Sequence, residues 1–141
     1  MGGAKSERVG LTNRKGRKKQ MSNWNIVKLE LARTDEYPSG SANHSYLIRV
    51  PLDENEIIDE TARAIDPGRA TIRRFWPNEP EQSGYVLKAN NGWAFSYAVG
   101  EEDDENLFHL ESHPIKQGEY LTVTEPNGDR LPYRIVAVSP D

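Results

Sequence analysis

The chain has 141 residues and no cysteine, and its 22 Asp and Glu against 18 Lys and Arg give a formal net charge of −4. This length suits one domain with a single hydrophobic core, and the lack of cysteine excludes disulfides, thiolate nucleophiles and cysteine-based metal centres. No apolar stretch approaches the roughly 20 residues of a membrane span, and no apolar run follows the basic N-terminal region as in a secretory signal. We therefore expect a soluble, cytoplasmic protein.

The charge is divided unequally along the chain. Residues 1–20 contain seven Lys and Arg and one acid, whereas residues 21–141 contain 11 Lys and Arg and 21 acids, so the two parts carry +6 and −10. The first part holds four glycines and only two large apolar residues, too few to offset the entropy of ordering, which predicts a disordered basic leader. Three explanations stay open: a start assigned too far upstream, which Met21 favours, a basic arm that binds nucleic acid or a membrane surface, and a localisation tag.

The body begins with a strand pattern. Residues 26–32 alternate, with Val27, Leu29 and Leu31 on one face and charged side chains on the other, as expected of a half-buried strand. A turn-rich stretch follows, and residues 45–50 then offer a second alternating segment with apolar side chains to one side.

A short helix is predicted next. Asp53 and Glu56 have the spacing of a capping box, and apolar residues recur at helical spacing up to Ile65, until Pro67 stops the run. Residues 70–76 are rich in apolar and aromatic side chains and form a further candidate strand.

A first hairpin is predicted around the Asn-Asn-Gly sequence at 90–92. A two-residue Asn-Gly turn would mix apolar and polar side chains on both faces. A three-residue loop with Gly92 in the left-handed conformation instead creates one apolar face. The pairs that we predict are Ala89 with Trp93, Leu87 with Phe95, and Tyr85 with Tyr97.

A second hairpin of the same design is predicted around the Pro-Asn-Gly sequence at 126–128. Its predicted pairs are Val123 with Leu131, Leu121 with Tyr133, and Thr122 with Pro132. Between the hairpins, five consecutive acids at 101–105 indicate a solvated loop, and a strand is expected around Phe108 and Leu110.

These elements predict a mainly β fold with one short α-helix. About seven short strands with regular turn signals are typical of a small antiparallel barrel or a two-sheet sandwich, and closing a barrel removes the exposed edges of a short sheet. We expect residues 21–141 to form this single domain.

The most suggestive group of side chains is His109, Glu111 and His113, which would share one face of a strand. Two imidazoles and a carboxylate are a known metal-ligand set, but the outer two Cα atoms would lie about 13 Å apart on a straight strand. Pro114 could supply the bend that brings them together, and His44 or the acidic run at 101–105 could supply another ligand. An exposed strand face without metal is the favoured explanation.

A basic and aromatic segment is the second candidate site. Its members are Arg69, Arg73, Arg74, Phe75 and Trp76, and this combination is used by barrels that hold single-stranded nucleic acid. Because the body carries −10, which repels phosphate, we favour arginines paired with surface acids and an aromatic in the core.

The third candidate is the predicted aromatic face of Tyr85, Trp93, Phe95 and Tyr97. Such a face can line a ligand cleft, but a core position is the more common explanation, and exposure of Trp93 would reverse that preference.

Enzymatic motifs do not stand out in this sequence. It contains neither a nucleophile elbow, nor a phosphate-binding glycine loop, nor a dinucleotide fingerprint. Our leading interpretation is a non-catalytic interaction or ligand-binding module without a cofactor, whose protein or small-molecule partner is unknown. Its expected contact residues are Trp76, Trp93, Tyr97, Arg73 and Arg74. Two alternatives stay open: a metal-dependent enzyme at His109, Glu111 and His113, and nucleic-acid binding by the leader and residues 69–76.

Overall fold

The computed structural model describes residues 23–90, 92–97, 107–111, 113–125 and 127–141, with the backbone alone for residues 107–111. The predicted leader at 1–20 and the acidic run at 101–105 lie outside these residues.

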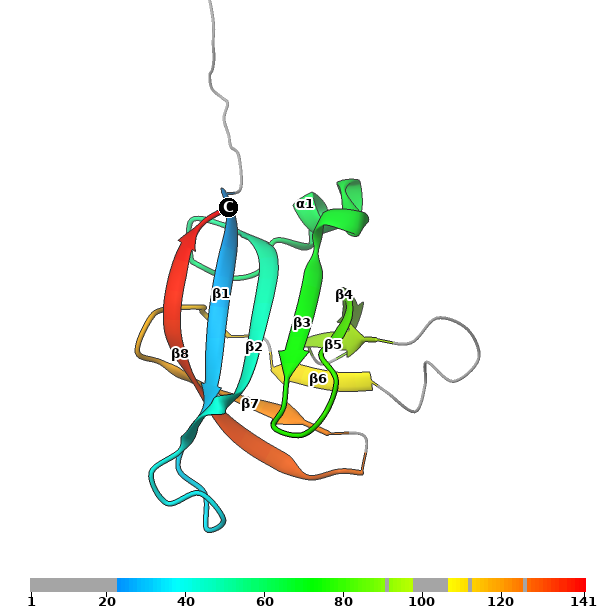
Figure 1. Cartoon of the computed structure of the whole chain (residues 1–141). Coiled ribbons are helices and arrows are strands. Elements are labelled where there is room, and N and C mark those ends of the chain that lie inside the picture. Colours follow the sequence, from blue (N-terminus) through cyan, green and yellow to red (C-terminus); the bar gives the residue numbers. More distant parts are fainter. Residues whose placement is uncertain (1–22, 91, 98–106, 112, 126) are drawn as a thin grey trace, which may run out of the picture.

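The domain is a closed antiparallel barrel of eight strands in which each strand pairs with the next along the chain and the last returns to the first (Figure 1). The predicted mainly β fold is therefore confirmed. The strands are β1 (Asn23–Leu31), β2 (Ser41–Leu52), β3 (Thr71–Phe75), β4 (Gln82–Ala89), β5 (Gly92–Ser96), β6 (Leu107–Glu111), β7 (Tyr120–Thr124) and β8 (Arg130–Pro140). Because the order is a simple meander, every connection joins neighbours in the sheet.

The core lies inside the barrel and follows the alternation of the strands. In the pairing of β1 with β2, Leu29 faces Tyr46 and Val27 faces Ile48, and all four are buried. The predicted inward faces of the first two strands are therefore confirmed. The largest fully buried side chains are Tyr46, Tyr133, Phe95, Leu29, Ile72, Ile135, Val27, Val50, Val86, Val123 and Pro51.

Strand β1 has a register shift on each side, and both shifts lie toward its C-terminal end. On the β2 side, Glu30 pairs with Ser45 while Leu31 pairs with Ser41, which leaves three extra residues in β2. On the β8 side, the register skips Val136. Extra residues bend a strand and break its alternation, so the barrel wall is irregular next to the loop that joins β1 to β2.

The helix is shorter than predicted. Helix α1 spans Glu60–Ile65, and its N-cap is Asp59, whose Oδ1 accepts a hydrogen bond from the Ala62 amide at 3.1 Å. The predicted capping box of Asp53 and Glu56 is wrong because Glu56 has a φ of 65°, which no helical residue adopts. Asp53 instead stabilises a turn by accepting two backbone amide hydrogen bonds. A 3₁₀ turn, η1 (Pro67–Arg69), follows the helix.

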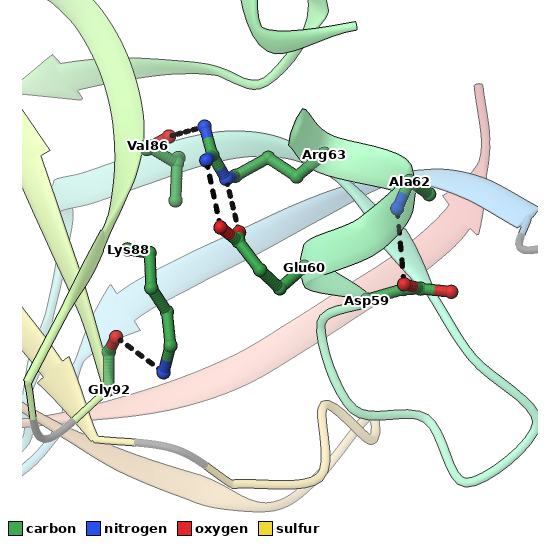
Figure 2. A network of polar contacts seen from close by, with 7 residues as sticks. All are labelled: Asp59, Glu60, Ala62, Arg63, Val86, Lys88 and Gly92. Atoms are coloured by element: carbon green, nitrogen blue, oxygen red, sulfur yellow. Dashed lines mark hydrogen bonds and ion pairs between the residues drawn. The ribbon is translucent and has the colours of Figure 1, made fainter. Parts of the chain in front are cut away.

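One arginine attaches the helix to the barrel. Arg63 forms a two-point ion pair with Glu60, at 2.7 and 3.1 Å, and its Nη1 lies 3.5 Å from the Val86 carbonyl oxygen on β4 (Figure 2). The Lys88 ammonium donates to the Gly92 carbonyl at 3.4 Å in the same view. The helix lies at the end of the barrel opposite the β1–β2 loop (Figure 1).

The first hairpin differs from its prediction by one residue. Ala89 pairs with Gly92, Lys88 with Trp93, and Val86 with Phe95, so Tyr85 and Leu87 point outward and are 49% and 41% exposed. The inward face of β4 contains Gly84, where a Cβ would lie 1.9 Å from the Ser96 carbonyl oxygen. Glycine at this position lets the two strands approach closely. Because glycine has no side chain, apolar alternation in the sequence did not indicate which face of β4 points inward.

The second hairpin matches its prediction. The pairs are Leu121 with Tyr133, Thr122 with Pro132, and Val123 with Leu131. Gly128 has a φ of 95°, the left-handed region that glycine adopts without steric cost. The hairpin reaches the same end of the barrel as the β1–β2 loop.

Candidate functional site

An arginine lies inside the barrel near the end that carries the β1–β2 loop. Arg74 on β3 faces Tyr46 on one side and Gln82 on the other, and it is only 8% exposed. A buried charge requires compensation. Nη1 of Arg74 donates to Glu79 at 3.0 Å and to Gln82 at 3.3 Å, and its guanidinium carbon lies 3.9 Å from the ring centroid of Trp76.

Three tyrosines surround this arginine in the interior. The rings of Tyr46 and Tyr133 meet edge to face at 5.1 Å. Burial raises the pKa of Tyr46 to about 12, although the Arg74 charge opposes the shift. Burial also raises the pKa of Tyr97 and of Tyr133. All three hydroxyls are therefore protonated at neutral pH, and the interior contains a neutral polar cluster around one fixed positive charge.

A small pocket of about 210 Å³ lies at this end of the barrel, and we call it the mouth pocket. It is lined by Leu31, Thr34, Glu36, Tyr37, His44, Trp76, Glu125, Asp129 and Leu131. These residues come from the end of β1 and the loop after it, from β2, from the position that follows β3, and from the β7–β8 hairpin. Barrel closure alone brings these four segments together.

Aromatic rings form one wall of the mouth pocket. The His44 ring lies 4.7 Å from Tyr37 and 4.5 Å from Trp76, centroid to centroid, and it meets Trp76 edge-on. Nδ1 of His44 lies 2.7 Å from the Ser41 hydroxyl. Burial, together with the charge of Arg74, lowers the pKa of His44, so this wall is uncharged at neutral pH.

Three carboxylates, from Glu36, Glu125 and Asp129, share the pocket with the aromatic wall. None of them forms an ion pair with any residue that the structure describes. Burial raises the pKa of Glu125, and the charge of Asp129 adds to the shift while Arg74 opposes it. The Glu125 amide donates to the Asp129 carbonyl at 2.8 Å, which fixes the two acids at the base of one turn.

The predicted contact residues do not lie together. Trp76 lines the mouth pocket, Arg74 lies beside its ring, and the half-buried Tyr97 belongs to the interior cluster. Arg73 points outward and forms a two-point ion pair with Glu81, at 2.6 and 3.0 Å. Trp93 is 3% exposed, with the Lys88 ammonium 5.0 Å from its ring centroid. Its burial agrees with the core explanation of the aromatic face.

The arginines of the predicted nucleic-acid segment are each engaged by a carboxylate. Arg69 binds Asp141 at 3.1 Å and lies over the Trp24 ring, Arg73 binds Glu81, and Arg74 binds Glu79 from inside the barrel. Adjacent residues of a strand also point to opposite faces. These three arginines therefore do not form one basic stripe.

The predicted metal ligands lie mostly outside the described side chains. His109 and Glu111 belong to β6, of which only the backbone is described, and Nδ1 of His113 lies 2.6 Å from the Pro114 carbonyl oxygen. Among the described side chains, no three His, Asp or Glu residues gather as a metal site. The metal hypothesis therefore stays a prediction.

Sequence reasoning missed most of the mouth pocket. Tyr37, Glu36, Glu125 and Asp129 lie in two loops about 90 positions apart, and only closure of β8 onto β1 brings them together. The two acids that flank the Pro-Asn-Gly turn were the available signal, because that hairpin was already predicted.

Comparisons of the chain with protein-family models, with curated proteins and with solved structures find no match. Within the described residues, no helix is both long enough and apolar enough to cross a membrane.

Proposed function

We propose that this protein is a non-catalytic binding module whose mouth pocket receives a basic side chain, lysine or arginine, of a protein partner. The observation that supports this proposal is the combination, in one small pocket, of an aromatic wall and three carboxylates that form no ion pair with any described residue. Carboxylates and aromatic faces are the two groups that attract an ammonium or guanidinium.

The size of the pocket favours a single side chain. Small-molecule sites usually enclose about 300–1,000 Å³, whereas the mouth pocket measures about 210 Å³. A lysine or arginine has a thin aliphatic stem and a charged end, and this shape suits a narrow opening with acids inside. The partner's remaining surface would then contact the rim.

The electrostatics support the same ligand. The pKa of Glu125 is raised mainly because its carboxylate is partly removed from water without an ion-pair partner. A cation that enters the pocket compensates that loss, and the interaction is stronger there than in open solvent. The body's formal charge of −10 would also speed the encounter with a basic partner.

The direct test is binding of short blocked peptides with one central arginine or lysine in an otherwise neutral sequence, compared with glutamine at the same place. We expect the basic peptides to bind with at least tenfold higher affinity than the glutamine peptide, measured by calorimetry. Glu125→Gln combined with Asp129→Asn should remove most of that difference, because it removes the charge and keeps the shape.

Glu54→Gln is the matched control, because Glu54 is exposed and lies outside the pocket. It removes one negative charge, as each of the two pocket substitutions does by itself, and it should leave the peptide affinity unchanged. Equal binding of basic and glutamine peptides would contradict the proposal, as would an equal loss of affinity in Glu54→Gln.

A further inference from the structure

A second and larger cavity lies on the outside of the barrel, where β1 has its register shifts. It measures about 460 Å³, and we call it the outer groove. Its lining comes from the end of β1, the β1–β2 loop, the start of β7 and the middle of β8. Arg33 and Arg134 supply its positive charge, and the half-exposed ring of Tyr120 forms part of its wall.

Ion pairing distinguishes Arg33 and Arg134 from most of the other described arginines. The described part of the chain contains eight arginines. Five of them form ion pairs with carboxylates, and Arg130 also has a partner. Arg33 and Arg134 form no ion pair with any residue that the structure describes, and both line the outer groove.

Arg134 lies in the centre of a row of outward side chains. Its register partners are Glu30 on β1 and Tyr120 on β7, while its neighbours Tyr133 and Ile135 are buried in the core. Glu30 is occupied by Lys28, whose ammonium lies 3.5 Å from it. Tyr120 is 57% exposed, so a large aromatic ring lies beside an arginine that forms no ion pair within the described part of the chain.

The loop that carries Arg33 is held by backbone hydrogen bonds. The Ala32 amide donates to the Pro132 carbonyl at 2.9 Å, and the amides of Thr34 and Gly40 both donate to the Tyr37 carbonyl. Gly40 has a φ of 75°, and a Cβ there would lie 2.7 Å from the Leu31 carbonyl oxygen. Arg33 is therefore presented from an ordered turn, which lowers the entropic cost of binding a ligand.

We propose that the outer groove binds a small phosphate-bearing molecule with a planar ring, the class to which mononucleotides belong. The two guanidinium groups bind the phosphate oxygens, and the exposed ring of Tyr120 stacks on the ring of the ligand. Arginine matches phosphate geometry through paired N–H donors, and aromatic side chains stack on bases of any sequence.

Size and charge both favour a small ligand over a nucleic-acid chain. The groove volume of about 460 Å³ lies within the usual range for small-molecule sites. A polymer would have to run along a body whose formal charge is −10, and this repulsion grows with every further phosphate. A single phosphate meets only the local charges of the groove, which are the two arginines and the Glu30 carboxylate that Lys28 holds.

The test uses the full chain with three probes: adenosine monophosphate, adenosine and inorganic phosphate. We expect the monophosphate to bind most tightly, and we expect Arg33→Gln combined with Arg134→Gln to weaken it at least tenfold. Tyr120→Ala should weaken the monophosphate several-fold and leave inorganic phosphate unchanged. Calorimetry measures the affinities, and the basic leader is present in every variant, so its contribution cancels.

Arg73→Gln is the matched control, because it removes one exposed arginine whose charge Glu81 already compensates. An equal loss of affinity in this control would overturn the proposal, since binding would then follow net charge. Failure of the monophosphate to bind, or binding of adenosine as tight as that of the monophosphate, would overturn it as well. Arg134→Lys keeps the charge but loses the paired donors, and an intermediate affinity is expected.

Discussion

The mouth pocket and the outer groove share the β1–β2 loop as a wall, and Leu31 lines both, yet they leave opposite charges without partners. The mouth pocket holds three carboxylates above a buried arginine, whereas the outer groove holds two arginines beside an exposed tyrosine. Most of the other described arginines form an ion pair with a carboxylate, so the groups in each cavity without such a pair indicate the charge of the ligand that it would bind. The two cavities should also differ in their contribution to stability, because the mouth pocket lies next to the buried charge of Arg74.

The largest expected difference between the two cavities is in the free energy of unfolding. Arg74→Met should lower the free energy of unfolding by about 2 kcal/mol, because it removes the hydrogen bonds to Glu79 and Gln82 and the contact of the guanidinium with the Trp76 ring. Arg134→Met, the same change in the outer groove, should alter it by less than about 0.5 kcal/mol. Urea denaturation of both variants measures the contrast, and equal losses would show that Arg74 does not support the interior.

A charge reversal in each cavity tests whether the two are independent. Glu125→Lys should lower the affinity for an arginine peptide by more than tenfold, since the added ammonium competes with the ligand's cation. The affinity of the outer groove for adenosine monophosphate should stay within about twofold, because Glu125 does not line that groove and physiological salt screens charges that are not in contact. Arg134→Glu should give the reverse pattern. A loss of both activities in either variant would mean that the cavities form one site.

The two cavities should also differ in how their ligand affinity depends on pH. The pKa of Glu125 is raised, so as pH falls this carboxylate loses its charge before an ordinary glutamate does. The pKa of His44 is lowered, so its ring is neutral at pH 7, and protonation at lower pH adds a positive charge. Both changes oppose a cation, so the affinity for an arginine peptide should fall about three- to tenfold between pH 7 and pH 5.

Two comparisons isolate the cause of that pH response. Glu125→Gln should reduce the slope of the profile, because the Glu125 carboxylate no longer contributes and, of the two changes, only the protonation of His44 is left. In the outer groove, arginines keep their charge throughout this range, so a sulfate ester, which keeps its own charge, should bind equally at both pH values. A steep pH dependence of sulfate-ester affinity would indicate that a titrating group other than the two arginines takes part in binding.

The sequence predicted the barrel better than it predicted either cavity. Clean alternation in residues 26–32 and the glycine turn at 126–128 produced correct faces and a correct register. The first hairpin was shifted by one residue because Gly84 leaves Val86 as the single apolar residue that β4 turns toward the core. Local patterns describe which face of a strand is buried, and they fail where a close approach of two backbones decides the register.

The cavities depend on contacts that local patterns do not contain. Trp76 and Arg74 were predicted contacts, but Glu36 and Glu125 meet only because the sheet closes. Arg33 and Arg134 carry no sequence signal of their own, since neither lies in a basic cluster. Their distinction is the lack of a carboxylate partner among the described residues, and this property emerges only when every other arginine has been assigned.

The smallest expected effect concerns the carboxylate next to Arg134. Lys28 holds Glu30 through a half-exposed contact of 3.5 Å, and such pairs contribute less than about 1 kcal/mol. Lys28→Met should free Glu30 to approach Arg134, its register partner on β8, and so weaken the monophosphate about twofold. Glu30→Gln should strengthen it by a similar factor. Lys116→Met removes an equal charge from a more exposed pair with Glu56 outside the groove, so an equal loss there would trace the effect to net charge and not to Glu30.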